Sequence, residues 1–481
     1  MARASTEIET KFDIAPDFAV PDLVRFAGDG GRVEDDVVEL SSTYHDTSDR
    51  DLLRFRLTLR RREGDVDTGW QLKVPGRGER TELHWPLGDA ADGLPAEAVE
   101  LLAPFLRGRP VAPAVRLDVR RQRHRIFDAD DQLLAEVAQD DVRAVDVGAP
   151  VKTPRWHEVE VELGTGSLAL QADIGEAILQ AGAYPSTSAT KFGRALLGIG
   201  NEGIGTARSS AGAVLVDYIG QQCNAIVAGH FGIPREADDS VHQTRVGCRR
   251  IRSTLRTFEH CFDVDQANVL EDELKWYATV LGEVRDRDVL RRRIGAAVRE
   301  LPEDLVVGPV SEHIDTILAG EQAARRADLL STMRGERYAN LLGEVTRWRD
   351  DPPFTAAADQ PANTLQDPVD RMQRKLAKRL DVATDHGGTD EDMHRARKTG
   401  KRLRYAAEAA ANDTKRALVK QTTSLQDLLG EFQDSVVAQD LLRRLASDAW
   451  SRGEDGFTYG VLVSEERRRA DEVRRLARKN R

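Results

Sequence analysis

The stretch that decides the fold of the first half of the chain is EIETKF, residues 7–12. Glu7, Glu9 and Lys11 alternate in it with two apolar residues and a threonine. Successive side chains of a β-strand point to opposite faces, so the pattern predicts a strand with two carboxylates and an amine on one face. That charged face either meets bulk water or lines a polar interior.

The same alternation continues out to about residue 195. It is found in RFRLTLRRRE (54–63), GWQLKVPG (69–76), RTELHWPL (80–87), VRRQRHRIF (119–127), LLAEVAQDDV (133–142) and HEVEVEL (157–163). Two helical segments interrupt it, near 95–106 and 168–181. Period-two alternation over so many segments predicts an antiparallel sheet or barrel. Large apolar side chains on the opposite face, such as Trp85, need cover from helices, and a closed sheet covered in this way would keep its charged face inside.

The charges of that face are sorted by strand, with Arg and Lys on some strands and carboxylates on others. A solvated outer face is the plain alternative, since many antiparallel sheets have one. In a closed interior, clustered Arg and Lys would bind phosphate oxygens, and clustered carboxylates would bind a hard cation such as Mg²⁺ or Mn²⁺. The combination favours a metal–phosphate ligand and attack of water on phosphorus.

These motifs resemble the CYTH domain, a triphosphate tunnel metalloenzyme. EIETKF is similar to its ExExK signature, and further matches follow in order: YHDT, LTLRRRE, WQLKVP, RTELHWPL, AEVAQDD, EVEVEL and SATKFGRAL. The resemblance covers essentially residues 5–197. It implies an eight-stranded antiparallel tunnel, open at both ends, with flanking helices.

The resemblance also implies roles for single residues. The expected metal ligands are Glu7, Glu9, Asp140, Glu158 and Glu160. The expected triphosphate-binding residues are Lys11, Arg60, Arg62, Lys73, Arg121 and Lys191, and the expected catalytic residues are Glu7, Glu9, Lys11 and Glu82. Glu162 and His84 share the inward face, and their roles stay open.

A change of composition divides the chain. Residues 198–212 are rich in Gly, Ser and Ala and predict a linker between a tunnel domain (1–197) and a helical domain (213–481). The expected fold class is therefore α+β multidomain, with an all-α second domain.

The second domain contains an internal repeat. His242 is followed by Arg245, Arg249, Arg250 and Arg252, and His394 is followed at the same offsets by Arg397, Lys401, Arg402 and Arg404. Downstream, LGEVRDRDV (281–289) is echoed by LGEFQDSVV (429–437). This duplication predicts two pseudo-symmetric helical bundles.

Each repeat would place its basic residues along one helical stripe, where like charges repel. A third stripe comprises Arg371, Arg374, Lys375, Lys378 and Arg379. Solvated charged faces are the alternative, but a long anion lying in a cleft would offset the repulsion. The stripes are poor in aromatic residues, which disfavours single-stranded nucleic acid.

This half resembles the CHAD domain, which implies a basic cavity that binds inorganic polyphosphate. The resemblance assigns polyphosphate binding to His242, Arg245, Arg249, Arg252, His394, Arg397, Lys401 and Arg404. For both histidines, a capping or packing role is the alternative.

Composition sets the remaining expectations. Three cysteines, a net charge of −11, the absence of a long apolar run and an N-terminus without an apolar leader predict a cytoplasmic protein, with polyphosphate granules as a candidate location. The sequence thus predicts Mg²⁺- or Mn²⁺-dependent hydrolysis of inorganic triphosphate, or of a terminal phosphate of short polyphosphate. A non-catalytic polyphosphate-binding protein and a nucleotide triphosphatase or cyclase are the alternatives.

Overall fold

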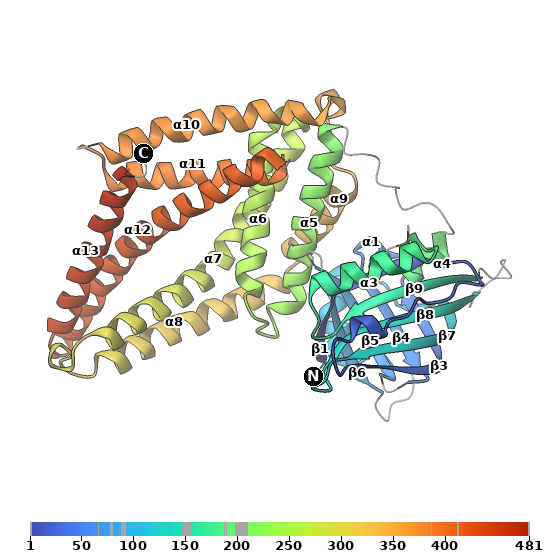
Figure 1. Ribbon diagram of the computed structural model, residues 1–481. Coiled ribbons are helices and arrows are strands. Elements are labelled where there is room, and N and C mark those ends of the chain that lie inside the picture. Colours follow the sequence, from blue (N-terminus) through green and yellow to red (C-terminus); the bar gives the residue numbers. More distant parts are fainter. Residues whose placement is uncertain are drawn as a thin grey trace. The chain divides into compact units, whose positions relative to one another are not determined.

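The computed structural model comprises two compact units, Met1–Thr206 and Ala207–Arg481 (Figure 1). It describes residues 2–65, 67–76, 80–87, 93–146, 155–186, 188, 190–197, 210–385, 387–410 and 413–479. Residues 198–209 of the predicted linker lie outside the described residues. Each unit is described by itself below.

The first unit is built on one antiparallel sheet. Its strands are β1 (Arg3–Glu7), β2 (Glu9–Asp13), β3 (Arg32–Asp46), β4 (Thr58–Glu63), β5 (Gly69–Pro75), β6 (Arg80–Pro86), β7 (Ala112–Phe127), β8 (Leu133–Asp146), β9 (Arg155–Leu163) and β10 (Tyr184–Pro185). Its helices are η1 (Val24–Phe26), α1 (Asp51–Arg54), α2 (Ala96–Leu106), α3 (Leu168–Gln180) and α4 (Lys191–Leu197). The predicted helical segments near 95–106 and 168–181 are thus confirmed as α2 and α3.

The N-terminal segment closes this sheet. The strand order is β1-β6-β5-β4-β3-β7-β8-β9-β2-β10, so β1 pairs with β6 while β2 pairs with β9. Since β1 and β2 are separated only by Ile8, one continuous segment joins the two sides of the sheet into a closed tunnel. Closure leaves no long unpaired edge between these strands.

Two details of the strand predictions are corrected. The sheet has ten strands rather than eight, because the first is interrupted at Ile8 and the short β10 is added beside β2. Residues 54–57 do not extend β4: Arg54 ends α1 and Arg56 has a φ of 58°, so the strand begins at Thr58. A left-handed residue cannot continue a pleated strand.

The two faces of the tunnel wall differ in polarity. On the outer face, an apolar cluster that includes Phe12, Val137 and Val161 packs with Ile174 and Ile178 of α3. The inward positions are charged over much of the tunnel but become apolar toward one end. An apolar cluster at that end includes Val119, Val142, Trp156 and Phe192. This end is therefore filled by side chains, unlike the tunnel open at both ends that the resemblance implies.

The second unit is helical. It comprises α5 (Ala211–Gly232), α6 (Ser240–Thr257), η2 (Glu259–Cys261), α7 (Val264–Glu300), η3 (Glu303–Leu305), α8 (Val310–Met333), α9 (Glu336–Asp350), η4 (Ala356–Asp359), η5 (Ala362–Leu365), α10 (Gln366–Thr384), α11 (Asp390–Ala409), α12 (Asp413–Ser451) and α13 (Phe457–Lys479). Local signals set several starts: Asp263 caps α7, and Thr389 with Asp392 forms a capping box at α11.

The helices repeat in the way that the sequence predicts. In α5–α8 each helix packs on the next, and α10–α13 show the same succession. The long pairs α7/α8 and α12/α13 stand out in Figure 1. The two halves meet where α6 packs on α11. Among the described helices, none combines the length and apolar character that crossing a bilayer requires.

Candidate functional site

A cavity of about 250 Å³ lies inside the tunnel. Eight carboxylates and eight cationic side chains are among its lining residues, which are Glu7, Glu9, Lys11, Tyr44, Thr58, Arg60, Arg62, Asp65, Asp67, Lys73, Arg80, Glu82, Arg121, Arg123, Glu136, Glu160, Glu162, Thr190, Lys191 and Phe192. The charged face of EIETKF therefore lines a polar interior. Tyr44 stacks on Phe192 with ring centroids 5.2 Å apart at the apolar end of this cavity.

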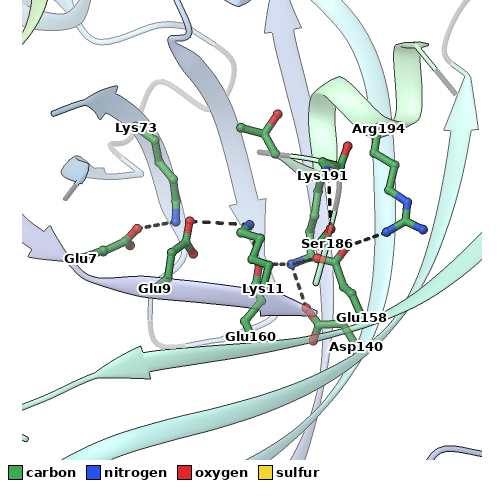
Figure 2. Close-up of polar contacts among 12 residues, drawn as sticks. Glu7, Glu9, Lys11, Lys73, Asp140, Glu158, Glu160, Ser186, Lys191 and Arg194 are labelled. Carbon is green, nitrogen blue, oxygen red and sulfur yellow. Dashed lines mark hydrogen bonds and ion pairs between the residues drawn. The ribbon is translucent and has the colours of Figure 1, made fainter. Parts of the chain in front are cut away.

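The three charged residues of EIETKF each contact a different strand. Glu7 accepts a hydrogen bond from Lys73 Nζ at 2.6 Å, and Glu9 accepts one from Arg80 at 2.7 Å. Lys11 Nζ donates to Glu160 at 2.6 Å (Figure 2). Burial favours the neutral form of Glu9, but the charges of Lys11 and Lys73 outweigh it and lower the pKa of this carboxyl.

Three buried carboxylates, Asp140, Glu158 and Glu160, form a compact group whose oxygens lie within 4.8 Å of one another. The ammonium of Lys191 lies among them, 3.0 Å from Asp140 and 2.6 Å from both Glu158 and Glu160 (Figure 2). Arg121 donates two hydrogen bonds of 2.8 Å to Asp140 and a third of 2.7 Å to Glu160. The group has ligands suited to a divalent cation, but Lys191 and Arg121 already neutralise it.

Glu158 and Asp140 do not line the cavity. Trp156 Nε1 donates to Glu158 at 2.6 Å, and Arg194 of α4 lies 3.7 Å from the same carboxylate. The resemblance to the CYTH domain implied that both acids are metal ligands, and strand parity does place them inward. Because both acids lie next to the apolar end of the tunnel, helix α4 covers them.

The opposite wall of the cavity carries cationic side chains suited to donate hydrogen bonds to phosphate oxygens. Arg60 donates to Gln71 at 2.6 Å and lies 3.5 Å from Glu82, which is also 3.5 Å from Lys73. Burial raises the pKa of Glu82, but the charges of Lys73 and Arg60 outweigh it, so the carboxyl is held ionised. One Glu82 oxygen is buried without a hydrogen-bond donor among the described residues.

Glu162 is the carboxylate that the sequence left without a role. It faces Glu9 on β2 and Glu136 on β8 in register, and all three line the cavity. Within the described part of the chain it forms no ion pair or hydrogen bond. Burial, together with the negative charges of Glu7 and Glu136, raises the pKa of Glu162 to about 7. We call Glu9, Glu136 and Glu162 the acidic wall. Glu9 has cationic partners, Arg80 at 2.7 Å and Lys11 at 3.6 Å, whereas Glu162 has none among the described residues.

The structure thus brings most of the predicted tunnel residues to one cavity. The predicted residues that line it are Glu7, Glu9, Lys11, Arg60, Arg62, Lys73, Glu82, Arg121, Glu160 and Lys191. Sequence reasoning did not assign Arg80, Arg123, Asp65, Asp67 and Tyr44, which also line it. Arg80 and Arg123 obey the same strand parity, and Asp67 becomes recognisable only in three dimensions, where it accepts from Arg62 at 2.6 Å.

A second charged site lies in the helical unit, where α6 meets α11. Arg245 and Arg249 of α6 lie near Arg397 and Lys401 of α11, and we call these four residues the seam cluster. The Nε atoms of Arg249 and Arg397 are buried without an acceptor among the described residues. Burial, followed by the charges of Arg249 and Arg397, lowers the pKa of Lys401 to about 6. Mutually repelling cations with unused donors are typical of an anion site.

Two predicted residues are neutralised elsewhere. Arg252 lies 3.3 Å from Glu271 of α7, and Arg404 lies 3.1 Å from Glu408 on its own helix. Arg245 of the seam cluster also has a carboxylate partner, since it donates to Asp286 of α7 at 2.8 Å. Arg249, Arg397 and Lys401 differ from all three, because they form no ion pair within the described part of the chain. A second basic group that the sequence did not assign surrounds Arg402, whose pKa is lowered by burial and by the charges of Arg256 and Arg379.

The two histidines occupy equivalent places in the repeat. Arg285 Nε lies 3.5 Å from His242 Nδ1, and Gln433 Oε1 lies 2.6 Å from His394 Nδ1. Arg285 and Gln433 are both the fifth residue of the LG repeat. The histidines therefore join the basic helix of each half to its long neighbour, α7 or α12.

Comparisons with known proteins agree with this division. A family model of the CYTH domain matches residues 5–191, and one of the CHAD domain matches residues 217–443. Two proteins of Mycobacterium tuberculosis, from strains CDC 1551 / Oshkosh and ATCC 25618 / H37Rv and both described as uncharacterized, are 32% identical over 487 residues. The matches cover 97% of this chain and 94% of each relative.

Solved structures similar to parts of the chain include three of low identity. PptA from Streptomyces chartreusis is 21% identical and covers 56% of this chain and 98% of its own, with a TM-score of 0.48. The CHAD domain from the plant Ricinus communis is 24% identical and covers 56% and 91%, with a TM-score of 0.44. A putative adenylate cyclase from Bacillus halodurans is 18% identical and covers 40% and 97%, with a TM-score of 0.29.

Proposed function

Because this chain belongs to the family of proteins in which a CYTH domain precedes a CHAD domain, we propose that it hydrolyses inorganic triphosphate in the tunnel and binds inorganic polyphosphate in the helical unit. The lining of the tunnel cavity supports the proposed triphosphate hydrolysis, because it contains equal numbers of carboxylates and cations, eight of each. A triphosphate needs several cationic groups for its oxygens, and its metal needs carboxylates.

A divalent cation fits the acidic wall better than the buried carboxylate group. Glu162 pairs in register with Glu9 on one side and Glu136 on the other, and burial, with the negative charges of Glu7 and Glu136, raises the pKa of Glu162. In our proposal these residues and Glu7 hold Mg²⁺ or Mn²⁺, while Asp140 and Glu158 fix Lys191 (3.0 and 2.6 Å). The bound cation would neutralise phosphate charge and acidify a water molecule.

The cationic side chains that line the cavity would bind the substrate. Arg60, Arg62, Lys73 and Arg121 project into the cavity from three strands and would bind the phosphate oxygens, replacing part of their present carboxylate contacts. Glu82, held ionised by the nearby charges of Lys73 and Arg60, would accept a proton from the attacking water. The apolar end of the cavity would exclude bulk water from the reacting phosphate.

The seam cluster supports the polyphosphate part of the proposal. Arg249, Arg397 and Lys401 have no carboxylate partner among the described residues, and the Nε atoms of the two arginines have no acceptor there. A phosphate chain would offer oxygens to several of these cations at once. A polyanion without bases also suits this site, because it needs no aromatic side chain for stacking. The tyrosine beside the cluster, Tyr405, already accepts a hydrogen bond from Arg249 at 3.2 Å.

Phosphate release from triphosphate, ATP and long-chain polyphosphate, each with Mg²⁺ or Mn²⁺, tests the tunnel. We expect release from triphosphate, lost in Glu7→Gln and Glu160→Gln and kept in Glu39→Gln, a control carboxylate exposed on the outer face of β3. Circular dichroism checks that each variant is folded. No turnover of any substrate, with long polyphosphate still bound, would leave a binding protein.

Binding of long polyphosphate in EDTA tests the helical unit separately. Arg249→Gln and Lys401→Gln should weaken binding by more than tenfold, whereas Lys275→Gln, an exposed residue of α7, should not. Equal binding by all three variants would refute the assignment of the seam cluster.

A further inference from the structure

The two halves of the helical unit differ in what covers their first helix. In the first half, α5 packs on α6 and is also covered by α9, η4 and η5. In the second half, α10 packs mainly on α11, with smaller contacts to α13 and η5, and nothing takes the place of α9. Among the described elements, α10 therefore has an outer face that its repeat counterpart does not have.

That outer face is basic. Arg371, Arg374, Lys375 and Lys378 are all exposed, and their spacing of three and four residues places them on one side of the helix. Within the described residues, these four side chains form no ion pair or hydrogen bond. Two exposed acids border the face, Asp367 at its N-terminal end and Asp381, three residues after Lys378, at its C-terminal end. The counterpart helix α5 has no Lys or Arg at all, so the repeat by itself does not require these charges.

Two further cations, Arg379 and Arg402, neither of which forms an ion pair within the described residues, lie between this face and the seam cluster. Arg379, one turn beyond Lys375 on α10, donates to the carbonyl oxygen of Arg395 on α11 at 3.2 Å. The charge of Arg379 also contributes to the lowered pKa of Arg402, which directly follows Lys401 in the sequence. Positive charge thus runs from the seam through Arg402 and Arg379 to the outer face of α10.

We propose that the outer face of α10 is an extension of the polyphosphate site that binds only the part of a chain that runs past the seam cluster. The inference rests on the polyphosphate binding proposed above and adds selection for chain length. Residues 371–378 add about 10 Å of basic helix at 1.5 Å per residue, a surface that a triphosphate held at the seam would not reach. The uniform backbone charge of polyphosphate matches a face with four cations and no aromatic residue.

The experiment measures binding of tripolyphosphate and of long-chain polyphosphate to the full chain in EDTA. The variant Arg371→Gln/Arg374→Gln/Lys375→Gln/Lys378→Gln is compared with a control of equal charge change, Lys275→Gln/Arg444→Gln/Arg467→Gln/Arg475→Gln, at exposed positions of other helices. We expect the α10 variant to lose at least tenfold in affinity for the long chain, with tripolyphosphate binding unchanged. The slope of log K against log salt for the long chain should become shallower by roughly 3, the value for four lost phosphate contacts on a single-stranded polyanion.

The outcomes separate the inference from the proposal on which it rests. Long-chain binding that is equal in the α10 variant and the control, but lost in Lys401→Gln, would overturn the inference and keep the seam site. A parallel loss of short and long chains in the α10 variant would also overturn it. Single-stranded DNA that binds α10 while polyphosphate does not would assign the face to nucleic acid. Absence of any polyphosphate binding by the wild-type chain would overturn both.

Discussion

Lys401 offers the sharpest test of the seam cluster, because removing its charge should stabilise the fold and weaken binding together. Its pKa falls from an ordinary 10.5 to about 6, through burial and through the charges of Arg249, Arg397 and Arg245, with Asp434 opposing. A difference of 4.5 units corresponds to ~6 kcal/mol of unfavourable free energy for the ammonium form in the folded state. A neutral side chain of similar length would not incur this cost.

We therefore expect Lys401→Met to increase the free energy of unfolding. Replacing strained buried charge by an apolar side chain typically gains about 1–4 kcal/mol. Between pH 6 and 10.5 the unfolded chain holds a proton that the folded chain has released, so wild-type stability rises with pH in this window, by up to ~1.4 kcal/mol per unit. The gain from the substitution should accordingly be larger at pH 6.5 than at pH 9.

Urea unfolding followed by circular dichroism measures this effect, with hydrogen exchange of α6 and α11 peptides to assign the transition to the helical unit. Lys398→Met is the matched control, since Lys398 is exposed on the same helix. The same Lys401→Met protein should bind long polyphosphate at least tenfold more weakly at pH 6.5. A variant that is less stable than wild type, or a gain that does not change with pH, would show that Lys401 is not held in a cluster of repelling cations.

Three further predictions concern the carboxylate partners. The pKa of Glu162, about 7, means that protons compete with a cation below that pH, so Mn²⁺ affinity by calorimetry should rise from pH 6 to pH 8 and lose this slope in Glu162→Gln. Lys191→Met should cost about 3–5 kcal/mol by leaving three buried carboxylates without their ammonium, and Mn²⁺ should recover part of the lost melting temperature; an unchanged melting temperature without metal would contradict the geometry. Arg293 lies 2.7 Å from Glu466, which is 2% exposed, and Arg293→Met should cost about 3 kcal/mol in urea unfolding. Among the described residues Glu466 would then keep Arg469, at 3.1 Å, as its one cationic partner; a loss below 1 kcal/mol would refute the prediction.

Strand parity predicted which tunnel side chains point inward, but not how far along the tunnel each one lies. Glu158 and Glu162 have the same parity in one strand. The structure places Glu158 against Lys191 and Arg194, and Glu162 in the cavity opposite Glu9. The difference depends on where α4 packs and which end of the tunnel becomes apolar, and both are decided by segments distant in sequence.

In the helical unit, the repeated His-x-x-Arg series predicted the duplication and the two stripes that meet between α6 and α11. It could not distinguish Arg249, which has no carboxylate partner among the described residues, from Arg252, which lies 3.3 Å from Glu271. Arg249 and Arg252 belong to the same repeated series on α6, and the carboxylate that separates them, Glu271, lies on the neighbouring helix α7.

The sequence by itself determined the two kinds of fold, the inward charged face and the basic repeat, because these depend on periods of two and 3.6 residues that a single segment carries. Only the tertiary structure decided which charges remain unpaired: the acidic wall around Glu162, the cations around Lys401 and the uncovered face of α10. Pairing depends on distances between segments far apart in the chain, and the free energy of a buried charge depends on its nearest partner.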